Sequence, residues 1–318
     1  MNTVTMPNSG KTVSRFFLGT DAIGLKNYEQ SAKRLDAALR LGINAMDSAY
    51  VYVGGDSERA LGKWMKERDN RDQVYIATKG AHPDANGPKV NPKAITADLM
   101  ESLSRLQTTY VDAYLLHRDD PTVPVGPIVE VLNEHLAAGR IHAFGGSNWT
   151  HERVREANDY ARAHKLTPFT LTSPYFGLCL QVDNPWGPGC VSIAGEEGRE
   201  ARAYYAEHRM PVLSYSSLGR GMLSGRVTRD NYKELLDHAA LTAYAHEVNF
   251  QRLDRARQMA GEKGITVPQL GLAYSLSQPI LVCPLVGANN EEELRQTVEA
   301  GQIRLTEQEC AWLENGDE

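Results

Sequence analysis

The chain has 318 residues and a formal net charge of −6, from 34 Lys and Arg against 40 Asp and Glu. The mixed signs leave neither a basic stripe for nucleic acid nor a charged tail. No apolar run approaches the roughly 20 residues that span a bilayer, and the first residues do not resemble a signal peptide. We therefore expect a cytoplasmic globular protein that binds neither nucleic acid nor a membrane.

The cysteines do not have the spacing of metal ligands, and no metal site is expected. A disulfide between Cys179 and Cys190 is one interpretation. Reduced thiols, as in a cytoplasmic protein, are the simpler one.

Short apolar runs alternate with amphipathic stretches along the chain. The runs are apolar on both faces, as buried parallel strands are, and predict strands at 16–20, 45–49, 74–78, 111–116, 141–144, 169–172, 212–216 and 280–286. The amphipathic stretches predict helices at 31–40, 57–65, 95–106, 128–138 and 152–163. Gly42 and Gly139 lie where a helix C-terminus favours a left-handed residue.

Eight strand–helix units in series favour a closed (β/α)8 TIM barrel, with residues 1–318 as a single domain. A doubly wound open sheet is the alternative, but no Gly-x-Gly-x-x-Gly follows the first strand. Two long segments, 175–195 and 218–249, would follow strands six and seven at the catalytic face. The second is expected to contain short helices. Both are either inserted surface loops or, as their Trp, Tyr and Gly content favours, loops that cover a ligand.

Polar side chains follow four consecutive predicted strands, at the end where a barrel places its catalytic groups. They are Asp47 and Tyr52 after the second strand, Lys79 after the third, His117 after the fourth, and Ser147 with Asn148 after the fifth. Taken singly, each has an ordinary interpretation as a helix cap, a half-buried tyrosine, a solvated lysine or a core histidine. Together they predict one catalytic site.

These groups permit a specific chemistry. A phenol has a pKa of about 10, and a neighbouring ammonium such as Lys79 lowers it, while Asp47 keeps the amine charged. Tyr52 would then act as a tuned general acid. His117 would orient a carbonyl and stabilise charge on its oxygen. The remaining requirement is a hydride source, which a cofactor normally supplies.

The same segments resemble those of the aldo-keto reductase family. The matching motifs are Asp47-Ser-Ala-Tyr-Val-Tyr52, Ala77-Thr-Lys79-Gly80, Leu115-Leu-His117-Arg-Asp119 and Gly145-Gly-Ser147-Asn148. The resemblance implies a TIM barrel that binds NADPH without a Rossmann domain and reduces an aldehyde or ketone. It implies that Tyr52 is the proton donor, with Lys79 and Asp47 as its tuning pair and His117 as the carbonyl-orienting residue.

The resemblance also implies a cofactor site. Ser147 and Asn148 would bind the nicotinamide carboxamide, and Tyr215 would stack on the ring. Thr172 stands three residues before Tyr175, where the family often has Gln, and would reach the carboxamide through water. The backbone of Ser216, Leu218 and Gly221 would hold the pyrophosphate, with Arg220 adding charge. The adenosine end would lie against a helix N-terminus at Gly287, Asn289, Asn290 and Glu293.

The adenosine segment departs from the family pattern. NADPH-preferring members usually carry Lys or Arg near the 2′-phosphate, whereas this chain has Gly287, Asn290 and Glu293. Arg295 or Arg220 would have to compensate. NADPH remains the expected cofactor, and NADH is the alternative.

The substrate is expected to be a small-molecule carbonyl compound bound by Tyr52, His117, Arg118 and Trp149. An Arg118–Asp119 pair beside aromatic walls suits a sugar-like or small polar aldehyde, and hence a role in carbohydrate metabolism. A structural Arg118–Asp119 ion pair is equally open, and Tyr50 is a second candidate for the acid. Two other functions remain: a cofactor-bound sensor or partner subunit with little turnover, and a lyase that uses Lys79 as a Schiff-base nucleophile. The oligomeric state and the reaction direction are left open.

Overall fold

The structure, a computed structural model, describes residues 3–316. Eight strands close a barrel in the order β10-β3-β4-β5-β6-β7-β8-β9, which confirms the predicted (β/α)8 fold. Their bounds are β3 Phe17–Gly19, β4 Ala45–Asp47, β5 Tyr75–Gly80, β6 Val111–Leu116, β7 Ile141–Ser147, β8 Leu171–Ser173, β9 Val212–Ser214 and β10 Val282–Val286. The chain divides into two compact units, an N-terminal unit (residues 3–173 and 287–291) and a C-terminal unit (174–286 and 292 onward).

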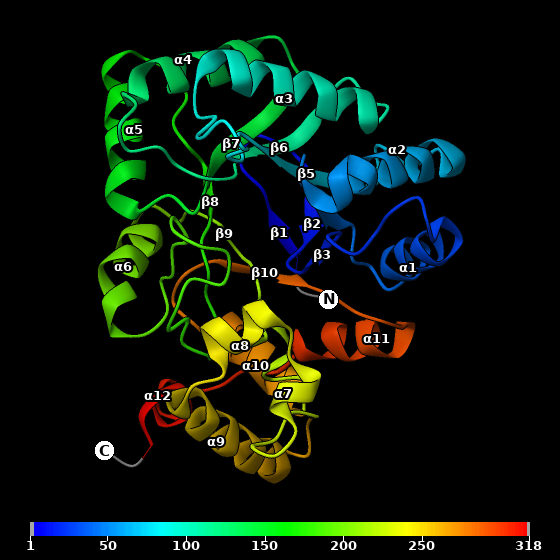
Figure 1. Cartoon of the computed structure of the whole chain (residues 1–318), viewed down its shortest axis with the longest axis vertical. Helices are drawn as coiled ribbons and strands as arrows, with labels where there is room; N and C mark the ends of the chain where they lie inside the picture. Colours follow the sequence, from blue (N-terminus) through cyan, green and yellow to red (C-terminus); the bar gives the residue numbers. More distant parts are fainter. Residues whose placement is uncertain (1–2, 317–318) are drawn as a thin grey trace. The chain divides into compact units, whose positions relative to one another are not determined.

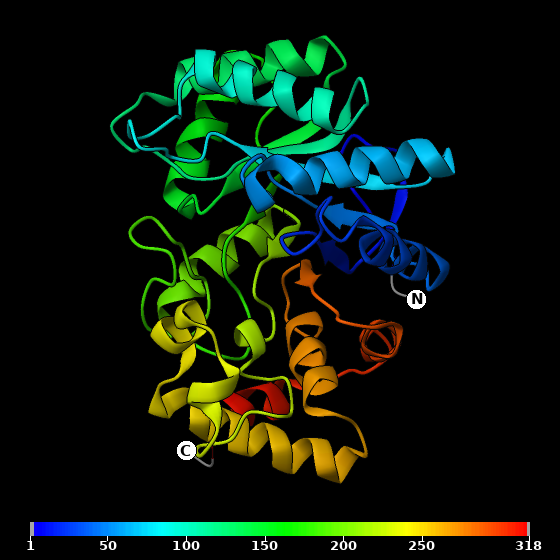
Figure 2. The same cartoon turned by 45° about the vertical axis from the view of Figure 1, so that its right-hand side comes forward.

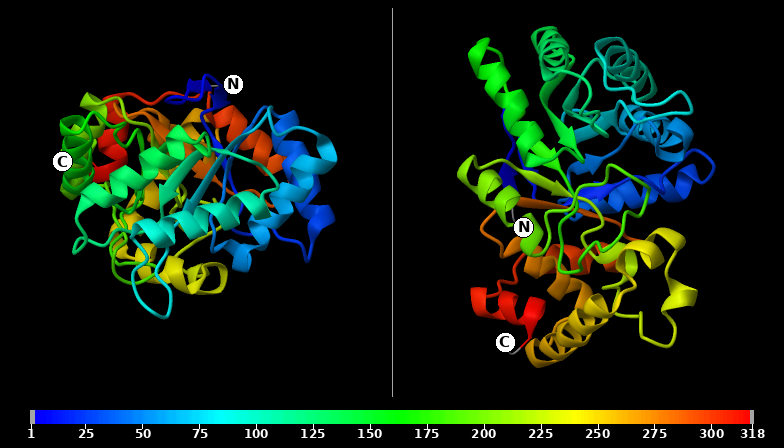
Figure 3. Two further views of the ribbon diagram at one scale, coloured as in Figure 1. Left: turned by 90° about the horizontal axis from the view of Figure 1, so that it is seen from above. Right: turned by 60° about the vertical axis from the view of Figure 1, so that its left-hand side comes forward.

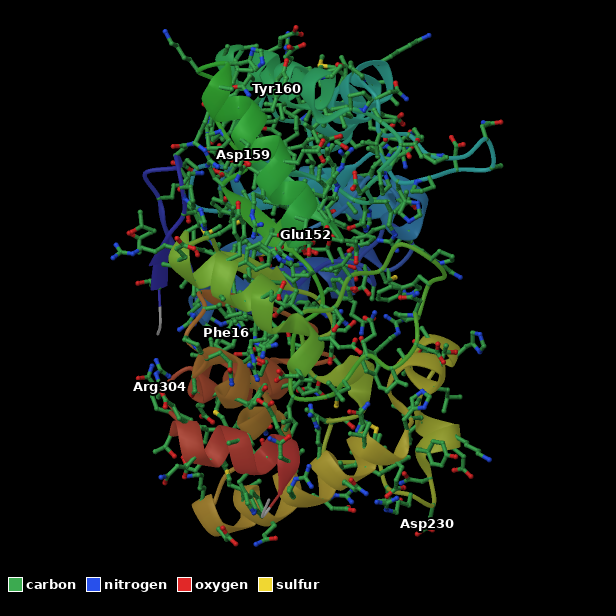
Figure 4. All side chains as sticks on the ribbon, turned by 90° about the vertical axis from the view of Figure 1, so that its left-hand side faces the viewer. Phe16, Glu152, Asp159, Tyr160, Asp230 and Arg304 are labelled. Carbon is green, nitrogen blue, oxygen red and sulfur yellow. The ribbon has the colours of Figure 1, made fainter. Side chains whose placement is uncertain are left out.

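The N-terminal unit repeats strand and helix regularly. Its helices are α1 Tyr28–Arg40, α2 Asp56–Arg68, α3 Pro92–Arg105, α4 Val125–Ala137 and α5 His151–Ala163. Each helix packs against the next in chain order (Figure 1) (Figure 2). Figure 4 shows Glu152, Asp159 and Tyr160 along α5. Gly42 and Gly139 have φ of 89° and 68°, so the left-handed residues predicted after the first and fourth of these helices are confirmed.

The parallel register brings the ends of neighbouring strands level. Asp47 is the last residue of β4 and pairs with Ala77 of β5, while Lys79 pairs with Leu115 of β6. Ser147, the last residue of β7, pairs with Ser173 of β8. Because the carboxyl ends of parallel strands share one edge, the candidate groups of this unit lie at one level of the sheet.

An antiparallel hairpin precedes the barrel and was not predicted. It joins β1 (Thr3–Thr5) to β2 (Thr12–Ser14). Lys11 in its turn places Nζ 2.8 Å from Oδ1 of Asp112, a completely buried residue of β6. That ion pair fastens the hairpin to the N-terminal unit.

The C-terminal unit is less regular. Its helices are α6 Arg199–Glu207, α7 Tyr232–Leu235, α8 His238–Tyr244, α9 Glu247–Lys263, α10 Val267–Leu276, α12 Glu307–Asn315 and, apart from its first residue, α11 Glu291–Ala300. Helix α9 packs against α10 and α12 (Figure 3). The segment 218–249 holds α7 and α8, so the predicted short helices are confirmed.

Two smaller expectations can be compared with residues 3–316. Cys179 is a buried free thiol, so it forms no disulfide with Cys190. None of the helices in the described part of the chain combines the length and the apolar character needed to cross a bilayer.

Candidate active site

Three of the four expected catalytic groups form one hydrogen-bonded cluster. The Lys79 ammonium donates to Asp47 Oδ2 at 2.7 Å, to the Ser48 carbonyl at 2.9 Å and to the Tyr52 hydroxyl at 3.2 Å. Asp47 and Lys79 are both buried, and Tyr52 is half-buried. Strand ends β4 and β5 therefore bring an acid, an amine and a phenol into one chain of contacts.

His117 is the fourth of the expected catalytic groups. It follows β6, and its backbone N–H donates to the Gly80 carbonyl at 2.7 Å. Its ring meets the Tyr52 ring edge to face, with centroids 5.8 Å apart. Within residues 3–316, buried His117 Nδ1 and buried Asp47 Oδ1 have no hydrogen-bond partner. Buried polar atoms are rarely left unsatisfied, so this site suits a polar ligand.

Burial shapes the electrostatics of the cluster. Burial opposes the charge on Lys79, but the Asp47 carboxylate and Tyr52 outweigh it, and the pKa of the lysine is raised. Burial raises the pKa of Asp47, against the opposing charge of Lys79. Burial, with the nearby positive charge of Lys79, lowers the pKa of His117 well below its usual value. The amine is therefore charged and the imidazole neutral near pH 7.

The pKa of Tyr52 differs from the sequence-based expectation. Burial raises it, and the Lys79 ammonium opposes that rise without reversing it. The expected lowering considered only the neighbouring cation and omitted the desolvation of the phenolate. Tyr52 therefore keeps its proton near pH 7, as a general acid must.

Tyr50, the other candidate acid, belongs to a different network. Its hydroxyl donates to Glu101 Oε2 at 2.8 Å, and the Arg105 guanidinium lies 4.2 Å from its ring centroid. Lys79 instead contacts Tyr52. The phenol next to the amine is thus that of Tyr52.

Sequence reasoning missed the side chains that hold the Tyr52 loop. Arg105 of α3 donates to the Tyr50 carbonyl at 2.8 Å and lies 3.3 Å from Glu58 Oε2. Glu58 of α2 is completely buried and accepts a hydrogen bond from Thr78 Oγ1 at 2.7 Å. Together they link the loop after β4 to strand β5. The sequence signal that could have revealed these side chains was a charged residue on the apolar face of a predicted helix.

Ser147 and Asn148 lie buried at the end of β7. Ser147 Oγ donates to the Ser173 carbonyl at 3.0 Å. Asn148 has φ of 58° and donates from Nδ2 to the His117 carbonyl at 3.4 Å. The hydroxyl of Thr172 donates to the Gly146 carbonyl at 3.2 Å, so its donor hydrogen is already used within the sheet.

The expected substrate residues are arranged around the backbone after β6. Arg118 donates to the His117 carbonyl at 3.0 Å, and Trp149 donates to the Arg118 carbonyl at 3.1 Å. Trp149 is completely buried, so substrate contact with its ring stays a prediction. Asp119 has an ion pair with Arg153, whose Nε lies 3.1 Å from Oδ2. Asp119 is thus paired with Arg153, and an Arg118–Asp119 pair stays a prediction.

In the C-terminal unit, Tyr215 directly follows β9. Its hydroxyl lies 3.4 Å from Gln181 Oε1, and its ring centroid lies 5.6 Å from that of Trp186 and 5.8 Å from that of Tyr175. The segment 175–195 therefore packs on Tyr215 within this unit.

The turn at residues 216–221, after Tyr215, contains several residues with positive φ. Ser216, Gly219, Arg220 and Gly221 have φ of 51°, 57°, 50° and 102°. Left-handed residues next to right-handed ones create backbone concavities that bind anions, which fits a pyrophosphate. Leu218 also lies in this turn, and Arg220 forms a 2.7 Å ion pair with Asp237.

Charges at the adenosine segment are already engaged. Arg295 Nε lies 3.3 Å from Glu292 Oε2, as Arg220 pairs with Asp237. A further cation, Arg40 of α1, lies 2.7 Å from Glu291 at the first residue of α11. Sequence reasoning missed Arg40 because it is 251 residues away in the chain. The other residues expected at the adenosine end of the cofactor are Gly287, Asn289, Asn290 and Glu293. A Cβ at Gly287 would meet open space, and the Glu293 carbonyl accepts a hydrogen bond from Thr297.

Comparison with known proteins agrees with this geometry. The aldo/keto reductase family model matches residues 15–318. Aldo-keto reductase YhdN of Bacillus subtilis is 30% identical, over 100% of this chain and 91% of the relative. An aldo-keto reductase from Klebsiella pneumoniae, solved in complex with NADPH, has a TM-score of 0.73 and 25% identity, covering 99% and 95% of the two chains. The thermostable aldo-keto reductase Tm1743 shares the fold, with a TM-score of 0.75, 21% identity and 99% coverage of both chains. A barrel whose strand ends carry this Asp, Tyr, Lys and His cluster, with a match over nearly its whole length, shows that the chain belongs to the aldo/keto reductase family.

Proposed function

We propose that the protein reduces an aldehyde or ketone to an alcohol, with NADPH as the reductant and Tyr52 as the general acid. One observation carries the proposal: the Tyr52 hydroxyl lies on the buried Lys79–Asp47 pair, beside a neutral His117. A protonated phenol next to a charged amine can pass its proton to the oxygen that receives the hydride's electrons, because the amine stabilises the phenolate that forms.

The residues present suit a dinucleotide. Bound NADPH would supply the hydride. In the N-terminal unit, Ser147 and Asn148 would hold the carboxamide, with Thr172 acting through water. In the C-terminal unit, Tyr215 would stack on the nicotinamide, and the left-handed turn with Ser216, Leu218, Arg220 and Gly221 would hold the pyrophosphate. The adenosine end would contact Gly287, Asn289, Asn290 and Glu293.

Each catalytic side chain has a distinct task. His117, being neutral, donates a hydrogen bond to the substrate oxygen without competing for the proton that Tyr52 transfers. Lys79 lowers the energy of the resulting phenolate, and Asp47 holds Lys79 charged. Because all of these groups are buried or half-buried, their charges act in a medium of low dielectric.

The substrate proposed is a small polar or sugar-like aldehyde, which would place the protein in carbohydrate metabolism. Arg118 and Trp149 are proposed to contact it, with Tyr52 and His117 at the carbonyl. The chain is proposed to act as one domain over 1–318.

The alternatives are less well supported. A Schiff-base lyase needs Lys79 as a neutral amine, whereas Asp47 and Tyr52 raise its pKa despite its burial. A sensor with little turnover could have the same side chains at the site, but it would not need fast proton transfer from Tyr52. NADH stays an alternative to NADPH because Glu291, Glu292 and Glu293 would repel a 2′-phosphate.

The test is a screen of aldehydes, ketones and sugars that follows nicotinamide absorbance with NADPH and with NADH. We expect steady turnover of at least one polar aldehyde. Turnover slower than cofactor release would favour the sensor. Borohydride trapping of a carbonyl compound on Lys79 would favour the lyase.

A further inference from the structure

A second imidazole lies at the site. His82 follows β5 by two residues, and its ring meets that of His117 edge to face, with centroids 4.9 Å apart and planes at 76°. It is half-buried. The His82 ring therefore directly contacts the ring of His117, the residue proposed to bind the substrate oxygen.

The backbone before His82 is held in place. Ala81 has φ of 57°, a left-handed conformation that costs a residue with a Cβ about 1 kcal/mol. Its N–H donates to Asp98 Oδ2 at 2.9 Å, and the other oxygen of Asp98 lies 2.6 Å from Lys89 Nζ. Strain that neighbouring contacts maintain is common at functional sites. Here it directs the chain so that His82 reaches His117.

The hydrogen bonding of His82 determines its tautomer. Nδ1 lies 2.8 Å from the Pro83 carbonyl oxygen. A carbonyl cannot donate, so Nδ1 must carry the hydrogen of this bond. Burial lowers the pKa of His82, helped by the positive charges of Arg118 and Lys89 and opposed by the bond to Pro83. The ring is therefore neutral near pH 7, and Nε2 is an acceptor.

We propose that His82 accepts a hydrogen bond from a substrate hydroxyl beside the carbonyl, so that the enzyme prefers hydroxy-aldehydes to aldehydes without a hydroxyl group. This inference rests on the proposed function and names its substrate class. An acceptor that loses water on binding is satisfied only by a substrate with a donor, and so discriminates against substrates that have none.

A simpler role for His82 is to pack against His117. A phenylalanine ring would give nearly the same edge-to-face contact but no acceptor. A glutamine would keep an acceptor oxygen without the aromatic ring. These two substitutions therefore separate packing from recognition.

The experiment measures kcat/KM with NADPH for glyceraldehyde and for propanal, which has the same carbon chain without hydroxyls. The proteins are the wild type, His82→Phe, His82→Gln and the control His164→Phe, which removes an exposed histidine stacked on Tyr160 of α5. We expect the wild type to prefer glyceraldehyde. His82→Phe should lower the glyceraldehyde/propanal ratio about tenfold, the size of one hydrogen bond.

We also expect His82→Gln to keep a higher ratio than His82→Phe, and His164→Phe to match the wild type. Equal losses for both substrates, or equal ratios in the two His82 variants, would assign His82 to packing and overturn the inference. A wild type that reduces both aldehydes without preference would overturn it while leaving the proposed function intact. Turnover of neither aldehyde, nor of any carbonyl compound in the wider screen, would remove the proposed function and the inference together.

Discussion

The two units contain ion pairs of the same length in different surroundings. In the N-terminal unit, Lys79 and Asp47 lie 2.7 Å apart, with side chains 3% and 2% exposed. In the C-terminal unit, Arg220 and Asp237 also lie 2.7 Å apart, but with side chains 31% and 50% exposed. Judged by distance alone, the two ion pairs would contribute equally to stability, but their different exposure to solvent makes their contributions unequal.

Removing one partner of a buried pair leaves an uncompensated charge, at a cost of about 3–5 kcal/mol. An exposed pair contributes about 0–1 kcal/mol, because water and salt replace the lost partner. The proposed proton-transfer groups thus lie in a preorganised cluster. The proposed pyrophosphate turn depends on weaker, adaptable contacts. Four substitutions or conditions should sharpen this contrast.

The largest effect is expected for Lys79→Met. It should lower the free energy of unfolding by about 3 kcal/mol, because Asp47 is left buried without a cation. It should also reduce kcat at least 100-fold, because the Tyr52 phenolate loses its stabilising charge. Urea unfolding and steady-state kinetics measure the two. The control Lys63→Met removes a partly exposed cation of α2, and it should change neither quantity by much; a matching loss there would contradict the role of burial.

Arg105→Gln should come next. The buried Glu58 loses its cation and the Tyr50 carbonyl loses a donor, so we expect a loss of about 2 kcal/mol in the free energy of unfolding. Because the Tyr52 loop is less well held, kcat should fall about tenfold. Arg59→Gln, which removes a more exposed guanidinium of α2, is the control. Unchanged kcat in Arg105→Gln would show that the loop holds its position without the guanidinium.

The low pKa of buried His117 should make the stability of the protein depend on pH. Its folded-state pKa is well below the unfolded value of about 6.5. Between these values the unfolded state binds one more proton, so stability falls as the pH drops below 6.5. Between pH 7.5 and 5.5, the wild type should lose about 1 kcal/mol more than His117→Gln. Urea unfolding at the two pH values checks this, and parallel losses would contradict a neutral buried imidazole.

The smallest effect on stability is expected for Arg220→Gln. The free energy of unfolding should change by less than about 1 kcal/mol. The Kd for NADPH should rise about fivefold, because a cation beside the proposed pyrophosphate turn is lost. Fluorescence titration with NADPH measures the affinity, and Arg229→Gln, which removes a partly exposed cation of the same unit, is the control. Equal affinities in both variants would separate Arg220 from the cofactor.

The N-terminal unit was the more predictable of the two. Strand β6 begins and ends at the predicted residues, Val111 and Leu116. Strand β5 runs on to Gly80 because it pairs with β6 up to Leu116, and that pairing is not visible in a local pattern. The hairpin of β1 and β2 was missed because each strand has a single apolar residue, Val4 or Val13, which gives too little of a pattern to detect.

The candidate site was predicted through its motif, and its supporting contacts were not. Asp47, Tyr52 and Lys79 meet as expected because they lie at neighbouring strand ends. Glu58 and Arg105 escaped notice because their partners come from separate helices and loops. His82 was missed because its position depends on the left-handed Ala81, and a left-handed alanine has no sequence signature.

The direct test of the account is Tyr52→Phe, with NADPH binding measured by fluorescence titration and hydride transfer measured in a single turnover. We expect a Kd for NADPH within about twofold of the wild type and a rate of hydride transfer lowered by at least about 100-fold, since the phenol acts only when the proton moves. A variant that transfers hydride at the wild-type rate would contradict the assignment of Tyr52 as the acid.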